Sequence, residues 1–188
     1  LTQPLIDTDI LLEKSIDWAT KLDSSYLPIQ GPPGAGKSYT GSHMIFDLIK
    51  KGKRIGITAL SHKVIVNLLE KIKQLADKEV FDLKIIYKGS STDEGDYPWD
   101  TAKNVDAIVA NLQNYHIVAG TSFMWCSEKL KDSLDYLFID EAGQFALIDT
   151  LVVSHASKNI ILLGDQQQLK QPIKGVHPEG TEVSALEH

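Results

Sequence analysis

The sequence lacks several features that define other classes of protein. It has a single cysteine, Cys126, in 188 residues, which excludes an internal disulfide and favours a reducing compartment. It has no apolar run long enough to span a membrane. Acidic residues interrupt the apolar positions near its start, which argues against a secretory signal. We therefore expect a soluble, cytoplasmic protein with no membrane partner.

The sequence has too few basic residues to give the protein a generally basic, nucleic-acid-binding surface. Lys and Arg number 19 against 25 Asp and Glu, which gives a net charge of -6. This balance excludes a generally basic surface but leaves room for a local basic groove. The histidines show no metal-ligand spacing with Cys126, so we expect no histidine or cysteine metal centre. With 43% hydrophobic residues and no repeat, residues 1–188 are predicted to form one domain, as a piece of a longer protein.

A glycine-rich stretch at residues 28–40 matches the phosphate-loop pattern Gly-x-x-x-x-Gly-Lys-Ser/Thr. Its glycines let consecutive backbone amides and the start of the next helix face an anion. Lys37 is expected to reach the β and γ phosphates, and the Ser38 hydroxyl to bind Mg²⁺. The pattern therefore predicts a nucleoside triphosphate site formed by Gly31, Pro32, Pro33, Gly34, Ala35, Gly36, Lys37, Ser38 and Tyr39.

Strand and helix patterns alternate along the chain. The expected strands are 26–30, 55–60, 83–87, 116–120, 136–139 and 159–163, and the expected helices are 7–22, 39–51, 64–75, 104–112 and 143–155. The first helix carries Leu11, Ser15, Trp18 and Leu22 along one stripe. Because the strand runs are continuously apolar, we predict an α/β fold with a parallel sheet sandwiched between helices.

Two segments lack a periodic pattern. Residues 88–103 are predicted to be a surface loop or insertion, in which Tyr97 and Trp99 either stack on a base or pin their own loop. The polar tail 174–188 is predicted to be a connector. Whether its last three residues are native or the start of a purification tag stays open.

An acidic pair follows the apolar run 136–139. Asp140 is expected to hold Mg²⁺ directly or through water, and Glu141 to orient and deprotonate an attacking water. An Asp-Glu pair by itself favours a solvated strand end. After a phosphate loop, at the carboxyl end of a buried strand, we expect it to be catalytic.

A third polar segment, Gly-Asp-Gln-Gln-Gln-Leu, follows the strand expected at 159–163. The Gln168 amide could hydrogen-bond a γ phosphate or the lytic water and so sense hydrolysis. The alternative is an exposed polar turn.

Together these motifs resemble motifs I, II and III of superfamily 1 helicases, in order, over residues 29–172. The Gly-Pro-Pro-Gly form of motif I and the Asp-Glu-Ala-x-Gln form of motif II are most similar to the branch of helicases that moves 5′ to 3′. Residues 58–63 resemble motif Ia and residues 118–122 the following strand-end motif, which in that family line the track for single-stranded DNA or RNA. On this resemblance the expected nucleic-acid contacts are Ser61, His62, Lys63, Thr121 and Ser122. Residues 27–30, 61–63 and 176–180 add a narrower resemblance to bacterial proteins that join a RecB-like nuclease to such a motor.

The resemblance implies the first of two RecA-like motor domains, with ATP and Mg²⁺ bound between them. It also has departures: Ala35 replaces Thr, His62 replaces Asn, and the proline of motif III is delayed to Pro172. Motifs IV to VI, with their charge-stabilising arginines, are absent, so we expect little activity from the isolated domain.

Some interpretations stay open at this point. His62 could contact a phosphate or be an ordinary surface histidine, and Thr121 and Ser122 could bind phosphates or cap a helix. We predict an ATP-dependent DNA or RNA helicase motor. The rivals are a phosphate-loop kinase or other small NTPase acting on a metabolite, and a non-catalytic nucleotide-gated module. The sequence does not decide between DNA and RNA, the direction of travel or the oligomeric state.

Overall fold

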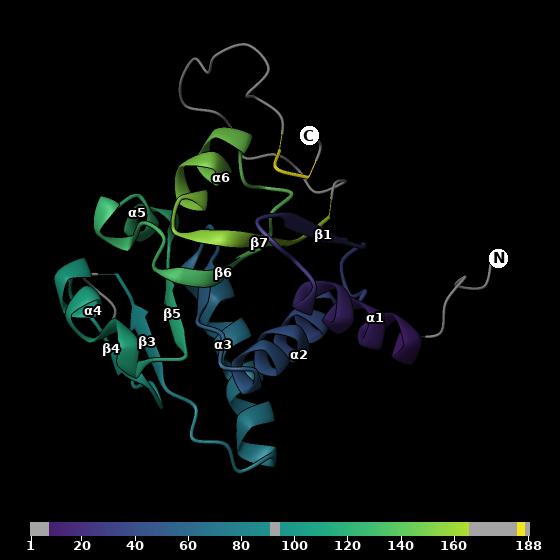
Figure 1. Ribbon diagram of the computed structural model, residues 1–188, viewed down its shortest axis with the longest axis horizontal. Helices are drawn as coiled ribbons and strands as arrows, with labels where there is room; N and C mark the ends of the chain where they lie inside the picture. The colour runs from purple at the N-terminus through teal and green to yellow at the C-terminus, as the bar shows by residue number, and fades with distance from the viewer. Residues whose placement is uncertain (1–7, 91–94, 166–183, 187–188) are drawn as a thin grey trace.

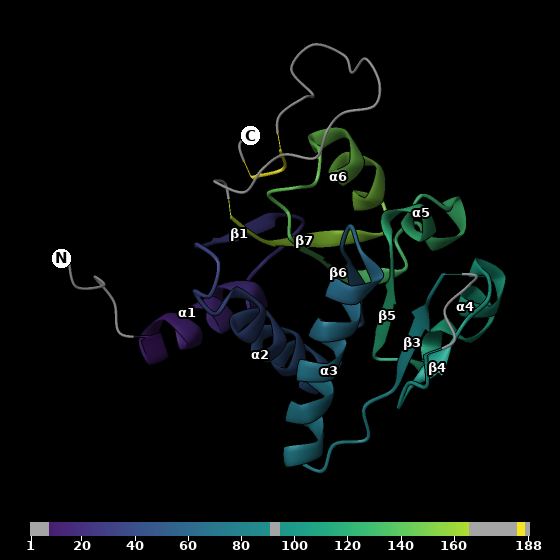
Figure 2. The same cartoon turned by 180° about the vertical axis from the view of Figure 1, so that it is seen from behind.

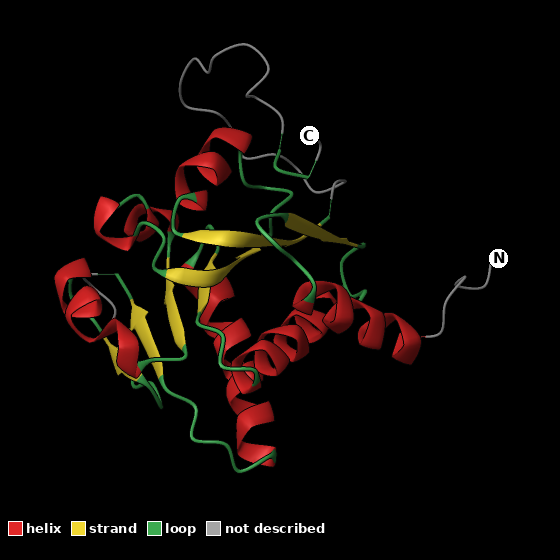
Figure 3. Cartoon of the chain, viewed as in Figure 1, coloured by secondary structure: helices red, strands yellow, loops and turns green. Residues whose placement is uncertain are grey.

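Seven strands form one sheet in the computed structural model, which describes residues 8–90, 95–165 and 184–186. The strand order is β1-β7-β6-β2-β5-β3-β4, and the pairings between these strands are parallel (Figures 1 and 3). Because the strands are parallel, all of them end at the same edge of the sheet. The strands are β1 (Tyr26–Gln30), β2 (Ile55–Thr58), β3 (Ile85–Lys88), β4 (Asp100–Thr101), β5 (Ile117–Gly120), β6 (Leu134–Asp140) and β7 (Ser157–Gly164).

Helices cover both faces of the sheet. One face carries α1 (Thr8–Thr20), α2 (Lys37–Lys50) and α3 (His62–Lys78). The other carries α4 (Val105–Asn111), α5 (Ser122–Trp125) and α6 (Leu147–Ser154), and two short 3-10 helices lie at Leu112–Asn114 and Glu128–Leu130. Figure 2 shows the two groups on opposite sides of the central strands. The predicted α/β sandwich is confirmed.

Strand side chains alternate between two separate cores. In β6, Tyr136 and Phe138 pack with the α1–α3 layer, whereas Leu137 and Ile139 pack with the α4–α6 layer. In β5, Val118 faces the second layer between two residues that face the first. Since both faces are buried, these strands read as continuous apolar runs in the sequence.

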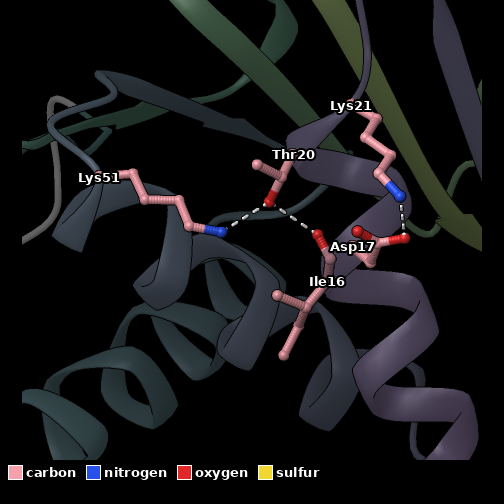
Figure 4. Close-up of polar contacts among 5 residues, drawn as sticks. All are labelled: Ile16, Asp17, Thr20, Lys21 and Lys51. Carbon is pink, nitrogen blue, oxygen red and sulfur yellow. Dashed lines mark hydrogen bonds and ion pairs between the residues drawn. The ribbon is translucent and has the colours of Figure 1, made fainter.

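Helix α1 is held against α2 by polar contacts at its last turn (Figure 4). The Lys51 ammonium donates to the Thr20 hydroxyl at 2.9 Å, and that hydroxyl donates to the Ile16 carbonyl at 2.9 Å. Ser15 and Ala19 of this helix are buried, whereas Trp18 is 48% exposed. Part of the predicted stripe therefore faces outward, because small side chains at Ser15 and Ala19 let α1 approach the core closely.

The predicted loop at 88–103 is partly structured. Lys88 belongs to β3, and β4 pairs with β3 through Asp100 and Thr101. The Tyr97 and Trp99 rings stack on each other with centroids 5.5 Å apart, and Tyr97 packs edge-on against Tyr87. This packing favours the second predicted alternative, in which Tyr97 and Trp99 pin their own loop.

Other element boundaries differ from the prediction. Helix α2 begins at Lys37, two residues earlier than expected, and α6 begins at Leu147 because residues 141–144 form turns after β6. The short α5 was not predicted. In the described parts of the chain, no helix is long and apolar enough to cross a membrane.

Candidate nucleotide-binding site

The phosphate loop connects the end of β1 to the start of α2. Gly34 and Gly36 have φ angles of 80° and 82°, a left-handed conformation that side chains other than glycine adopt at a cost in strain. Gly36 is the N-cap of α2 and supplies no side-chain capping bond. The first amides of α2 are therefore available to an anion, which is the arrangement expected at a phosphate site.

The Lys37 side chain folds back over its own loop. Its ammonium donates to the Gly31 carbonyl at 2.6 Å and to the Pro32 carbonyl at 2.8 Å. The Gly31 amide in turn donates to the carbonyl of Gly164 at 3.2 Å, which joins the loop to the end of β7. The ammonium thus lies over the loop, within reach of any anion that the loop would bind.

The acidic pair stands at the end of β6. The Asp140 side chain is 5% exposed, and one of its carboxylate oxygens accepts a hydrogen bond of 2.9 Å from the Glu141 amide. Burial raises the pKa of the Asp140 carboxyl to about 6, and the Glu141 charge adds to the rise. The hydrogen bond from Glu141 and the positive charges of Lys71 and Lys37 oppose it.

The turn after Asp140 packs very tightly on the end of β7. Glu141 has a φ of 57°, which is rare for a residue other than glycine and is found at functional sites. The Ala142 amide donates a hydrogen bond of 2.8 Å to the Leu163 carbonyl. A Cβ atom on Gly143 would lie 2.0 Å from the Asp165 carbonyl oxygen, so only glycine fits there. This contact fixes the position of the acidic pair relative to β7.

Four of the predicted catalytic and metal-binding side chains meet in one cleft. It encloses about 200 Å³ and is lined by Lys37, Ser38, Val64, Asn67, Leu68, Lys71, Asp140, Glu141 and Gly164. Four of these, Lys37, Ser38, Asp140 and Glu141, were predicted from the sequence. Pro32 to Gly36 are exposed at the loop surface, and the Tyr39 ring packs on His43 with centroids 4.1 Å apart. Gln168, the predicted sensor, lies outside the described residues.

Sequence reasoning missed the wall that α3 contributes to this cleft. Four residues of α3 share one helical face, because Asn67 and Leu68 each lie three or four residues from both Val64 and Lys71. The helical spacing predicts Val64 and Leu68 as core residues. The polar residues Asn67 and Lys71 on the same face were the signal that this face borders a binding site. Lys71 brings a second positive charge to the acidic pair.

The nucleic-acid candidates on α3 fall into different environments. The exposed Ser61 is the N-cap of α3, and its hydroxyl accepts a hydrogen bond of 3.3 Å from the Val64 amide. The His62 Nδ1 lies 2.7 Å from the Tyr87 hydroxyl, and the exposed Lys63 lies beside it. His62 and Lys63 line a second cavity of about 370 Å³ with Val66, Asn67, Ser90 and Tyr97. Asn67 lines both cavities.

The other two candidates, Thr121 and Ser122, lie after the end of β5. Both are half-buried, and Thr121 is the N-cap of α5 without a side-chain capping bond. Thr121 thus occupies the helix-cap position of the alternative interpretation, but its hydroxyl makes no capping bond. Their strand neighbours β2, with Ile57 opposite Ala119, so they lie next to the segment that follows β2.

The cleft fits a magnesium-bound triphosphate by the chemistry of its donors. It offers unsatisfied helix amides, a lysine ammonium, a serine hydroxyl and a buried carboxylate with a raised pKa. Among the residues that the structure describes, no group of three or more His, Cys, Asp or Glu side chains could hold a metal by itself. A metal here would need phosphate oxygens and water to complete its ligands, as Mg²⁺ commonly does.

The sequence is similar to those of known proteins. Residues 99–174 match a protein-family model described as an AAA domain. The chain is 31% identical over 182 residues to the "DNA replication ATP-dependent helicase/nuclease dna2" of Schizosaccharomyces pombe, covering 90% of this chain and 13% of that protein. It is 30% identical over 146 residues to "Reverse gyrase" of Methanocaldococcus jannaschii, covering 76% of this chain and 8% of that protein. The chain thus spans a small part of these relatives.

Solved structures show the same fold. The arterivirus nonstructural protein 10 helicase in complex with DNA has a TM-score of 0.52 at 19% identity, covering 89% of this chain and 33% of that one. The restriction-modification enzyme LlaGI with a DNA substrate mimic has a TM-score of 0.55 at 17% identity, and the match covers 85% of this chain and 17% of that one. The predicted RecA-like fold is confirmed.

Proposed function

We propose that this chain, which is a RecA-like domain of the superfamily 1 helicase type, binds Mg-ATP and couples its hydrolysis to movement on single-stranded nucleic acid. The observation that carries the proposal is the cleft in which Lys37, Ser38, Asp140 and Glu141 meet, although they come from distant parts of the chain. The relatives named helicases support it. The activity of the whole protein is part of this proposal.

The phosphate loop and Lys37 would bind the triphosphate. The exposed loop from Pro32 to Gly36 and the uncapped start of α2 would direct amide hydrogens at the phosphates. Lys37 already lies over this loop, so a small rotation of its side chain exchanges two carbonyl partners for phosphate oxygens. This exchange is favourable because a charge-assisted bond to an anion is stronger than one to a neutral carbonyl.

The acidic pair would hold the metal and activate water. The Ser38 hydroxyl and the Asp140 carboxylate are the side chains placed to hold Mg²⁺, which when bound supplies positive charge to the phosphates. A bound Mg²⁺ would keep Asp140 ionised despite its burial. Glu141 would take a proton from the attacking water. Gln168 stays the proposed sensor of the γ phosphate.

The nucleic acid would run along the edge where β2 and β5 end. The support is the neighbouring position of Ser61, His62 and Lys63 with Thr121 and Ser122, together with relatives whose names include DNA helicase and nuclease. The Ser61 hydroxyl already caps α3 and the His62 ring contacts the Tyr87 hydroxyl, so the exposed Lys63 is the stronger candidate on that helix. A second RecA-like domain and a fused nuclease are proposed for the longer protein, because this chain spans 13% of the first relative.

The rival kinase or metabolite NTPase is not favoured, because the curated relatives are named helicase/nuclease or reverse gyrase. The intact set of Lys37, Ser38, Asp140 and Glu141 gives no support to a non-catalytic module. A cytoplasmic location stays a prediction that rests on the single cysteine.

The decisive experiment measures ATP hydrolysis in a protein that carries this domain and a second motor domain. We expect single-stranded oligothymidine or oligouridine to raise the rate severalfold or more, and Glu141→Gln to abolish the rate while ATP binding remains. The isolated 188-residue chain should hydrolyse ATP slowly, because an arginine supplied from outside is worth several orders of magnitude. A rate that no single strand changes, or brisk unwinding by the isolated chain, would contradict the proposal.

A further inference from the structure

Phe123 is an aromatic side chain that the fold leaves in water. It is 89% exposed, the highest value for an aromatic residue in the described ranges. The next two residues, Met124 and Trp125, are by contrast fully or almost fully buried. The chain therefore anchors α5 in the core on one side and presents Phe123 to solvent on the other.

The anchor beneath Phe123 is rigid. The Trp125 indole donates to the Gly120 carbonyl at 3.1 Å and approaches the Ile57 carbonyl at 3.4 Å, so it joins α5 to the ends of β5 and β2. The Trp125 carbonyl lies 2.6 Å from the His155 Nε2, which joins α5 to the end of α6. Figures 1 and 2 show α5 beside α6 at the rim of the sheet. Phe123 thus needs to order only its own side chain when it binds a partner.

The position of Phe123 relates it to the proposed nucleic-acid path. It directly follows Thr121 and Ser122, and β5 pairs with β2, whose following segment leads to His62 and Lys63. One strand separates β5 from β6, which places the end of β5 about 10 Å from the strand that carries Asp140. Phe123 therefore stands beside the proposed path and apart from the nucleotide cleft.

We infer that Phe123 stacks on an unpaired nucleobase while Thr121 and Ser122 hold the neighbouring phosphate. This inference deepens the proposed function and rests on it. Single-strand-binding proteins combine backbone contacts with aromatic stacking, because every base has a face on which a ring can lie. The rings of Tyr97 and Trp99 stack on each other, whereas Phe123 is presented outward. The stacking is expected to be tolerant of base identity.

The first test is photochemical crosslinking of the 188-residue chain to a short oligothymidine that carries 5-iodouracil, with the crosslinked residue mapped by mass spectrometry. Iodouracil reacts with aromatic rings on which it stacks, so we expect the crosslink at Phe123. A crosslink confined to other residues, such as His62, would leave the proposed nucleic-acid path standing and overturn the role of Phe123. No crosslink at any residue would contradict both.

The second test compares substitutions by fluorescence anisotropy with labelled oligothymidine. Phe123→Ala should weaken binding about tenfold, and Phe123→Trp should retain it because stacking is preserved. Phe123→Leu keeps an apolar side chain but removes the ring, so it should bind like the alanine variant. Tyr26→Ala is the matched control. Tyr26 is 63% exposed and begins β1, an outermost strand that three strands separate from β5.

The native cysteine offers a reporter that needs no mutation. Cys126 is exposed and lies three residues from Phe123, so a fluorophore on its thiol reports on the same side of α5. Oligothymidine should change the emission of this dye in the unmodified chain and much less in Phe123→Ala. Equal affinity of Phe123→Ala and the unmodified chain, or full binding by Phe123→Leu, would refute stacking.

Discussion

The Lys37 ammonium lies 2.6 Å from the carbonyl oxygen of Gly31, six residues earlier in the same loop. A cation held by neutral carbonyls of its own loop is readily transferred to an anion, because the anion offers the stronger bond. The loop is therefore organised around the position where a phosphate would bind, before any phosphate is present.

Replacing this lysine should remove nucleotide affinity without harming the fold. We expect Lys37→Ala to weaken binding of a fluorescent ATP analogue by about ten- to a hundredfold, because a hydrogen bond to a charged group is lost. The melting temperature without nucleotide should stay nearly unchanged, since the carbonyls of Gly31 and Pro32 can turn to water. The control is Lys78→Ala, which changes a lysine at the last residue of α3 and should bind normally. Equal affinity in both variants would show that the loop does not bind phosphate.

The buried carboxyl of Asp140 should make stability depend on pH. Its pKa is about 6 in the folded protein against 3.8 for the free side chain, so between these values the folded state binds the proton more tightly. The free energy of unfolding should therefore fall as pH rises from about 4 to about 6, and level off above. Asp140→Asn should lose this slope and be more stable at neutral pH by about 2–3 kcal/mol.

Urea unfolding at pH 4.5 and pH 7.5 would measure this difference for both proteins. Asp106→Asn is the matched control, because Asp106 is exposed and pairs with Lys129 at the surface. Its unfolding curve should follow the unmodified protein at both pH values. An Asp140→Asn variant less stable than the unmodified chain at pH 7.5 would be incompatible with the raised pKa.

Removing the carboxylate at Glu141 should separate binding from chemistry. In a protein that includes the second motor domain, Glu141→Gln should lower the hydrolysis rate by at least about a hundredfold, the usual contribution of a general base. ATP affinity should remain within about threefold, because the glutamine keeps the size of the side chain and Lys37 and Ser38 are untouched. Single-turnover hydrolysis and equilibrium binding would measure the two effects. Substantial hydrolysis by this variant would assign the water-activating role to another group.

The contact between Gly143 and Asp165 should tolerate no added carbon. Gly143→Ala would place a Cβ atom 2.0 Å from a backbone oxygen, so the turn after Asp140 must move. We expect a loss of stability of about 1–3 kcal/mol and a matching loss of hydrolysis. Gly52→Ala is the control, because Gly52 has a φ of 76° but open space around it, so its cost is backbone strain alone. Thermal melting of both variants would compare them, and an effect of Gly143→Ala no larger than the control would contradict this packing.

Much of the site followed from short stretches of sequence. The phosphate loop, the strand that ends at Asp140 and the sandwich of helices around a parallel sheet were all predicted, because local spacing dictates turns, helix faces and buried strands. Boundaries were less accurate where a tight turn replaces a helix, as at residues 141–144. The roles of Gln168 and of the proposed nucleic-acid contacts stay predictions.

The sequence by itself determined which residues have the right chemistry, since a glycine-rich loop, a lysine and paired carboxylates are local features. Only the tertiary structure decided which of them meet. The strand order placed β7 between β1 and β6, which brought the phosphate loop and the acidic pair together. Packing turned Lys71 of α3 toward the acidic pair, and it buried Ala19 while leaving Trp18 and Phe123 in water. These outcomes depend on how all the strands and helices fill one core together, and no short window of sequence contains that information.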